Sequence, residues 1–188
     1  VQSVKAVDAF TATNPTNASI RVTWKAPKSL FGAKVTGYIV EYSSTAGKSW
    51  TAIKLKAVLS HTIATNLEAG TKYSVRVKAI TTLSKISKAG AASAVVSVTP
   101  TTAPQAPLLT SGNTVTSTSN PTWVQQSVAQ RGGLPVTYVA TATATGQPTV
   151  TCTTISNSCI FVGLVAGTSY SLKLVATNTR GSVDAVTE

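Results

Sequence analysis

The sequence is poor in the side chains that carry out most enzymatic chemistry. Its 188 residues include only five acidic residues and a single histidine, His61. No two acidic residues share a short motif, and no recognisable spacing joins His61 to a serine and a carboxylate. The GxSxG, HExxH, P-loop and GxGxxG patterns are also missing. We therefore expect no enzymatic activity, no cofactor and no catalytic or metal-binding residues.

Long apolar stretches are absent too. No run of eighteen apolar residues occurs, which predicts no membrane-spanning helix. No basic segment followed by an apolar one opens the chain, so no signal peptide is expected in it. The chain begins at Val1 and contains no methionine. We expect a processed protein or a piece of a longer one.

Cysteine is scarce, and the two copies lie close together in CTTISNSC, Cys152 to Cys159. The Ser, Thr and Asn residues between them are typical of a turn. A disulfide here would close a short loop, stabilise it by about 2–3 kcal/mol and indicate an oxidising compartment. Two buried thiols are the alternative. A zinc site is not indicated, because His61 is the only histidine and lies in the other half of the chain.

Charge is distributed unevenly. Thirteen Lys and Arg residues against three acidic residues give residues 1–100 a net charge of +10, whereas three against two give the remainder +1. This asymmetry favours an anionic partner for the first half alone. Lysines that merely keep a β-domain soluble would produce the same balance.

Period-two alternation dominates the chain. ASIRVTW at 18–24, GYIVEY at 37–42, TKYSVRVKA at 71–79 and SAVVSVT at 93–99 alternate apolar and polar residues. Such segments predict half-buried antiparallel strands. The pattern stops at TPTTAPQAP, residues 99–107, which has three prolines and is typical of a stiff linker. We predict a basic domain at 1–100, a Pro-rich linker at 101–107 and a second domain at 108–188.

One segment occurs twice. LEAGTKYSVRVKAI at 67–80 and LVAGTSYSLKLVAT at 164–177 are identical at seven of fourteen positions. Two more aromatic pairs match at nearly the same offset, Trp24 with Trp123 and Tyr38 with Tyr138. One structural plan is therefore used twice. We expect its core to consist of Trp24, Tyr38, Leu67, Tyr73, Trp123, Tyr138, Leu164 and Tyr170.

The repeated pattern Leu-x-x-Gly-Thr-x-Tyr has a physical explanation. The leucine ends a strand in the core, and the glycine allows a sharp turn between two sheets. The tyrosine ring is then buried while its hydroxyl hydrogen-bonds to the backbone of the corner, which is the tyrosine corner of Greek-key sandwiches.

These residues resemble fibronectin type III domains, once from Trp24 to SVTP at 97–100 and again from Trp123 to ATN at 176–178. The second set is similar to tandem modules of secreted and cell-surface proteins of bacteria. The resemblance implies an all-β fold of two immunoglobulin-like Greek-key antiparallel β-sandwiches in tandem. Two departures stand out. Pro121 precedes Trp123, so that strand is expected to start late or lie at an edge. The second unit ends early, so its last strand is expected to be incomplete or supplied from outside.

The resemblance does not identify a partner, because this fold serves many roles. A candidate basic binding face comprises Lys72, Arg76 and Lys78 on one strand, with Lys85 and Lys88 in the loop that follows. A solvated face with extended lysine side chains would look the same. Nucleic acid is not indicated, because aromatic residues are not interleaved with the basic ones.

We therefore expect an extracellular or cell-surface structural and adhesive module that acts as a spacer, stalk or array building block. Its partners would be an anionic cell-wall polymer or polysaccharide, or neighbouring subunits in a homo-oligomer. Two alternatives are an accessory module of a secreted carbohydrate-active enzyme and a self-assembling surface-layer or filament subunit. Trp50 is the one tryptophan outside the expected core, and the accessory module would require it to be exposed. Sharing of an edge strand through residues 1–6 is a further possibility for assembly.

Overall fold

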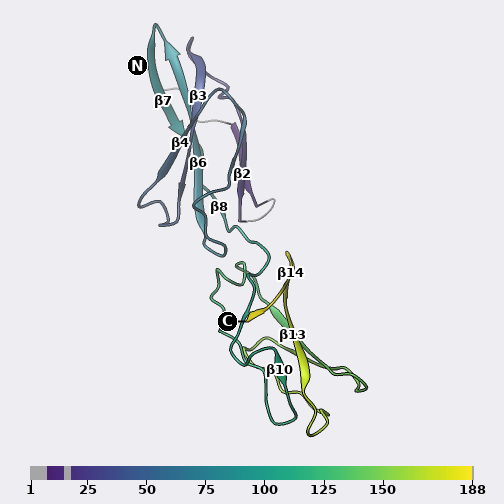
Figure 1. The fold of residues 1–188 in the computed structure, drawn as a ribbon. Helices are drawn as coiled ribbons and strands as arrows, with labels where there is room; N and C mark the ends of the chain where they lie inside the picture. Colours follow the sequence, from purple (N-terminus) through teal and green to yellow (C-terminus); the bar gives the residue numbers. More distant parts are fainter. Residues whose placement is uncertain (1–7, 15–17, 188) are drawn as a thin grey trace. The chain divides into compact units, whose positions relative to one another are not determined.

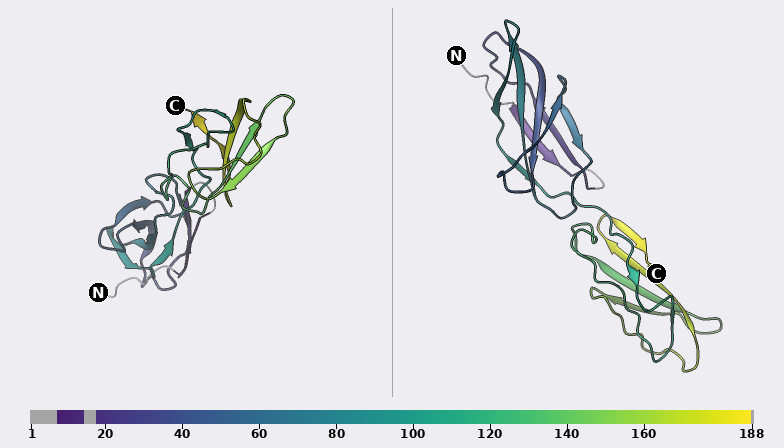
Figure 2. Two further views of the ribbon diagram at one scale, coloured as in Figure 1. Left: turned by 90° about the horizontal axis from the view of Figure 1, so that it is seen from below. Right: turned by 60° about the vertical axis from the view of Figure 1, so that its left-hand side comes forward.

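The computed structural model describes residues 8–14 and 18–187, and all of its regular elements are β-strands. The chain divides into two compact units, Val1–Pro100 and Thr101–Glu188. Figures 1 and 2 show strands along both units. No helix among these residues is long and apolar enough to cross a membrane. The predicted all-β class and its β-sandwiches are confirmed.

Unit 1 is a sandwich of two antiparallel sheets. The smaller sheet has the order β1-β2-β5, with bounds Asp8–Thr13, Ile20–Lys25 and Ser60–Ile63. The larger has the order β4-β3-β6-β7, with bounds Thr51–Leu55, Lys34–Ser43, Tyr73–Leu83 and Ile86–Ala92. Strand β8, Val96–Val98, also pairs with β6.

The alternation in the sequence determines which side chains of unit 1 are buried. Along β6, Tyr73, Val75, Val77 and Ala79 are buried, whereas the residues between them are half-buried on the outer face. Trp24 and Tyr38 meet in the core with ring centroids 5.2 Å apart in an edge-on arrangement. The burial of these side chains and the contact between the two rings together stabilise this core.

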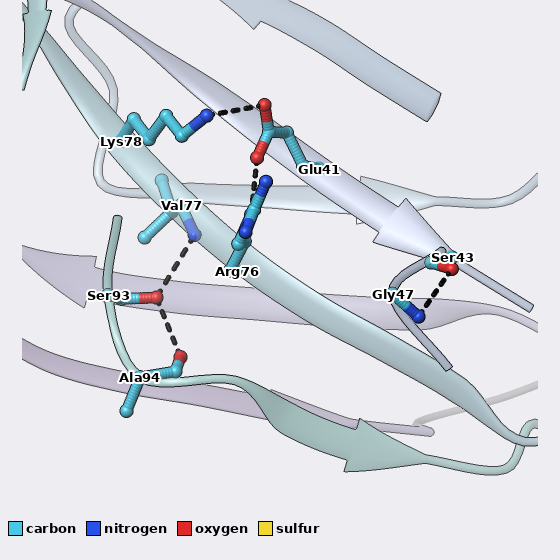
Figure 3. A network of polar contacts seen from close by, with 8 residues as sticks. All are labelled: Glu41, Ser43, Gly47, Arg76, Val77, Lys78, Ser93 and Ala94. Carbon is cyan, nitrogen blue, oxygen red and sulfur yellow. Dashed lines mark hydrogen bonds and ion pairs between the residues drawn. The ribbon is translucent and has the colours of Figure 1, made fainter. Parts of the chain in front are cut away.

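The chain segment that follows β6 and pairs with it is interrupted at Ser93. Its backbone nitrogen donates to the carbonyl of Val77. Its hydroxyl accepts from the nitrogen of Val77 and donates to the carbonyl of Ala94 (Figure 3). The serine side chain thus satisfies a backbone group where the strand pairing is irregular. The segment consequently divides into β7 and β8.

Unit 2 repeats the larger sheet in the order β10-β13-β11-β12. The bounds are Thr114–Val115, Tyr170–Asn178, Thr137–Thr143 and Val150–Thr154, and β14, Gly181–Asp184, also pairs with β13. In its core Trp123 and Tyr138 lie 5.1 Å apart. The Tyr138 hydroxyl donates to buried Gln126 at 2.8 Å, a contact that the sequence pattern did not predict.

The opposite layer of unit 2 is fragmentary. Strand β15, Val186–Thr187, pairs in parallel with β9, Leu108–Leu109. Around Pro121 only two isolated bridges form, Leu109 with Trp123 and Thr122 with Ser158. A proline cannot donate to a ladder, which explains why the strand predicted there is reduced to single bridges.

Residues 101–107, predicted as a linker, are hydrogen-bonded to the second unit. The backbone nitrogen of Thr102 donates to Gly132, and that of Gln105 donates to Gln130. The segment therefore belongs structurally to unit 2. The predicted strand sharing concerns residues 1–6, which lie outside the described residues.

Both tyrosine corners form. The backbone nitrogen of Glu68 donates to the Tyr73 hydroxyl at 2.9 Å, and that of Val165 donates to the Tyr170 hydroxyl at 3.1 Å. Gly70 and Gly167 have φ values of 81° and 75°, which an L side chain rarely adopts. The six aromatic core residues are buried, while Leu67 and Leu164 are half-buried at the margins of the two cores.

Candidate functional site

The five predicted basic residues do not form one continuous face. Arg76 and Lys78 lie on the outer face of β6, and Lys72 immediately precedes that strand. Lys85 lies in the turn after β6. Lys88, expected in the loop, instead lies on β7 opposite Thr81, because the turn is only two residues long.

Glu41 neutralises the centre of this surface. In the register of β3 with β6, Glu41 lies directly opposite Arg76. Its carboxylate accepts a hydrogen bond from the Arg76 Nε at 2.5 Å and another from the Lys78 Nζ at 2.8 Å (Figure 3). Two cations thus share one carboxylate, and about half of their combined charge is balanced locally.

The surroundings of Glu41 alter its pKa. Partial burial acts to raise the pKa of this carboxyl, but the hydrogen bonds from Lys78 and Arg76 and their positive charges outweigh it. The net result is a pKa below its ordinary value. Glu41 therefore remains ionised at neutral pH and keeps both ion pairs.

Trp50 is covered by the same arginine. The guanidinium carbon of Arg76 lies 3.9 Å from the centroid of the Trp50 ring, a cation–π contact. The accessory-module alternative requires an exposed Trp50, whereas Trp50 is half-buried. One feature could have indicated this contact. Trp50 directly precedes β4, and only β3 separates β4 from β6, the strand of Arg76, in the sheet order.

Lys72, Lys85 and Lys88 remain available for other contacts. All three are exposed, and none forms an ion pair within the described ranges 8–14 and 18–187. The candidate surface thus separates into a neutralised centre at Glu41 and exposed lysines outside it.

The two cysteines of unit 2 are joined by a disulfide with an S–S distance of 1.97 Å. Cys152 lies on the edge strand β12, and Cys159 follows Ser158, which bridges to Thr122 in the opposite layer. The bond therefore connects the two layers along one side of unit 2.

No group of three or more His, Cys, Asp or Glu residues that could hold a metal ion occurs in the part of the chain that the structure describes.

A model of the fibronectin type III domain family matches residues 5–99. Among solved structures, the chain is similar to the FN1–FN3 domains of chicken CNTN1, with 14% identity over 100% of this chain and 69% of that one, at a TM-score of 0.46. It is also similar to the sixth fibronectin type III domain of human fibronectin type III domain containing protein 3, with 26% identity over 56% of this chain and 95% of that one, at a TM-score of 0.45. The FN5 domain of Drosophila Lar is 24% identical over 50% of this chain and 94% of that one, at a TM-score of 0.40.

Proposed function

Because the chain belongs to the fibronectin type III domain family, whose domains are typically non-catalytic structural modules, we propose that it is an extracellular spacer, stalk or array module. The observation that carries this proposal is that each unit is closed by its own tyrosine corner and its own Trp–Tyr pair. Each unit therefore has the interactions that a separate mechanical element requires.

The extracellular part of the proposal is supported by the disulfide. A bond between Cys152 and Cys159 persists in an oxidising compartment and is reduced in most cytosols. Fibronectin type III domains are also commonly extracellular.

Stretching single molecules of the full chain tests the spacer role. We expect two separate unfolding events, each releasing about 300 Å of chain, since each unit has roughly 90 residues of at most about 3.6 Å. Under oxidising conditions the disulfide holds the Cα atoms of Cys152 and Cys159 6.1 Å apart, so reduction should lengthen one event by about 19 Å. Extension without resistance, or a single event, would refute separate load-bearing units.

We further propose that unit 1 attaches to an anionic surface. The supporting observations are its net charge of +10 and the exposed Lys72, Lys85 and Lys88. Binding of the chain to dextran sulfate beads should weaken steeply between 0.1 M and 1 M salt, as the Debye length falls from about 10 Å to about 3 Å. Salt-independent binding would refute an electrostatic attachment. Sedimentation of the chain over the same salt range tests the array alternative, because it shows whether copies of the chain assemble.

The accessory-module alternative requires an accessible aromatic platform, and Arg76 covers the face of Trp50. We therefore expect Trp50→Ala to leave any retention on chitin, cellulose or peptidoglycan unchanged. A loss of retention that Arg76→Ala does not share would instead favour the carbohydrate role.

A further inference from the structure

Three chain segments meet at one end of unit 1, and we call residues 26–33, 56–59 and 83–88 the tip. Lys34, at the start of β3, pairs with Thr82 near the end of β6. The backbone nitrogen of Trp24 donates to the carbonyl of Leu59, which brings the second segment to the same end. At the opposite end of β6, Tyr73 pairs with Val98, close to where the chain leaves unit 1.

The tip exposes large apolar side chains. Six such residues are exposed in the described part of unit 1, and all but Val95 lie at the tip, with 43% to 62% of their surface accessible: Phe31, Val58, Leu59, Leu83 and Ile86. None of the five belongs to the hydrophobic core of unit 1. A single exposed apolar residue is ordinary, but a group of them on one end indicates a contact surface.

The backbone of the tip is strained where it presents these side chains. Phe31 has a φ of 48°, and Ser84 and Lys85 have φ values of 49° and 67°. Residues other than glycine rarely adopt this region, and a bulky one does so at a cost. The turn formed by Ser84 and Lys85 places Leu83 directly opposite Ile86, so the pair stands together at the end of the hairpin.

Lysines surround the apolar group. The exposed lysines in or next to the tip are Lys25, Lys28, Lys34, Lys56, Lys85 and Lys88. No acidic residue occurs in the three tip segments. Of the acidic residues of unit 1, Asp8 lies opposite Lys25 in the backbone register of β1 with β2, Glu41 lies farther along β3, and Glu68 lies at the tyrosine corner.

We propose that the tip docks on an anionic lipid bilayer. Phe31, Leu83 and Ile86 enter the boundary between headgroups and acyl chains, while the surrounding lysines lie against lipid phosphates. This inference rests on the proposed attachment to an anionic surface and identifies that surface. A hydrated anionic polymer would satisfy the lysines equally well, but it has no apolar phase in which the exposed side chains could be buried.

Unit 2 provides an internal comparison. It also exposes large apolar residues, including Ile155, Ile160 and Val162, but no charged residue occurs between Arg131 and Lys173. Charge complementarity to an anionic bilayer is therefore found at the tip and is missing around these residues.

Sedimentation of the full chain with lipid vesicles tests the proposal. We expect binding to vesicles of equal parts phosphatidylglycerol and phosphatidylcholine and little binding to phosphatidylcholine alone. The double variant Leu83→Ser/Ile86→Ser should bind anionic vesicles at least about tenfold more weakly, since it removes two apolar side chains from the boundary. The double variant Lys85→Gln/Lys88→Gln should bind anionic vesicles about fivefold more weakly for each lysine that is replaced. The matched control is Val95→Ser, an exposed apolar residue away from the tip, which should bind normally.

A fluorescent label reports insertion directly. A polarity-sensitive dye on Leu83→Cys should shift to the blue and brighten with anionic vesicles, whereas the same dye on Val95→Cys or Val162→Cys should not. If the serine variants bind vesicles normally and the dye at Leu83 stays in water, the lipid proposal is overturned. If the original chain instead fails to bind anionic vesicles but binds dextran sulfate beads, the lipid proposal is overturned and the anionic attachment stands. If it binds neither, both proposals are overturned.

Discussion

The hydroxyl of Tyr73 accepts a hydrogen bond from the backbone nitrogen of Glu68, five residues earlier, at 2.9 Å. Tyr170 has the same relationship to Val165. We predict that Tyr73→Phe lowers the free energy of unfolding of unit 1 by about 1–2 kcal/mol, because it removes the acceptor of a partly buried donor and leaves the ring in place. Amide hydrogen exchange at Val75 and Val77 measures this loss.

The second corner serves as the control. Tyr73→Phe should leave the exchange of Leu172 and Leu174 in unit 2 unchanged, and Tyr170→Phe should have the reverse effect. Equal acceleration in both units after either substitution would argue against two separately closed sandwiches.

The carboxylate of Glu41 should make the stability of unit 1 depend on pH. We predict that Glu41→Gln lowers the free energy of unfolding by about 1–2 kcal/mol at neutral pH, because two charge-assisted hydrogen bonds are weakened. The pKa of Glu41 is lowered from its ordinary value of 4.5 in the folded chain. Its stabilisation is therefore complete above that value and is lost as the pH falls through the folded pKa.

Urea denaturation at several pH values measures this effect. The difference between the original chain and Glu41→Gln should shrink as the solution becomes more acidic than pH 4.5. Glu68→Gln, at an exposed carboxylate, is the control and should change stability by less than about 0.5 kcal/mol. A difference that stays constant into strong acid would assign the loss to packing and not to charge.

The sequence predicted those features that depend on local patterns. Alternation and the Leu-x-x-Gly-Thr-x-Tyr motif place Tyr73 and Tyr170 correctly, because a tyrosine corner is completed within a few residues. The contact of Arg76 with Trp50 was missed, because it depends on the register of three strands, which no short pattern encodes. Lys88 was misplaced because a two-residue turn of Ser and Lys lacks the usual Asn-Gly signal.

The disulfide should stabilise unit 2 selectively. We predict that the double variant Cys152→Ser/Cys159→Ser lowers the free energy of unfolding of that unit by about 2–3 kcal/mol, because the unfolded chain is no longer constrained by the closed loop. Denaturation followed by hydrogen exchange should show the loss on β11 and β12 and none on β3 and β6. An equal loss in a reduced but otherwise unchanged chain would confirm that the bond itself is responsible, whereas no loss would contradict the prediction.

Gly132 and Gly112 provide a matched test of how residues 101–107 are held against unit 2. Both glycines have a φ of 73°, so alanine at either position carries the cost of a left-handed backbone, about 1–2 kcal/mol. A Cβ on Gly112 would meet nothing within 4 Å, whereas one on Gly132 would lie 2.1 Å from the carbonyl oxygen of Thr102.

Thr102 cannot easily move away from a side chain at position 132. Its nitrogen donates to the Gly132 carbonyl at 3.0 Å, and its own carbonyl accepts from Asn178 at 2.9 Å. We therefore predict that Gly132→Ala destabilises unit 2 by at least about 2 kcal/mol more than Gly112→Ala, as measured by urea denaturation of the full chain. If the two variants unfold at the same urea concentration, residues 101–107 can leave unit 2 at little cost and act as a linker after all.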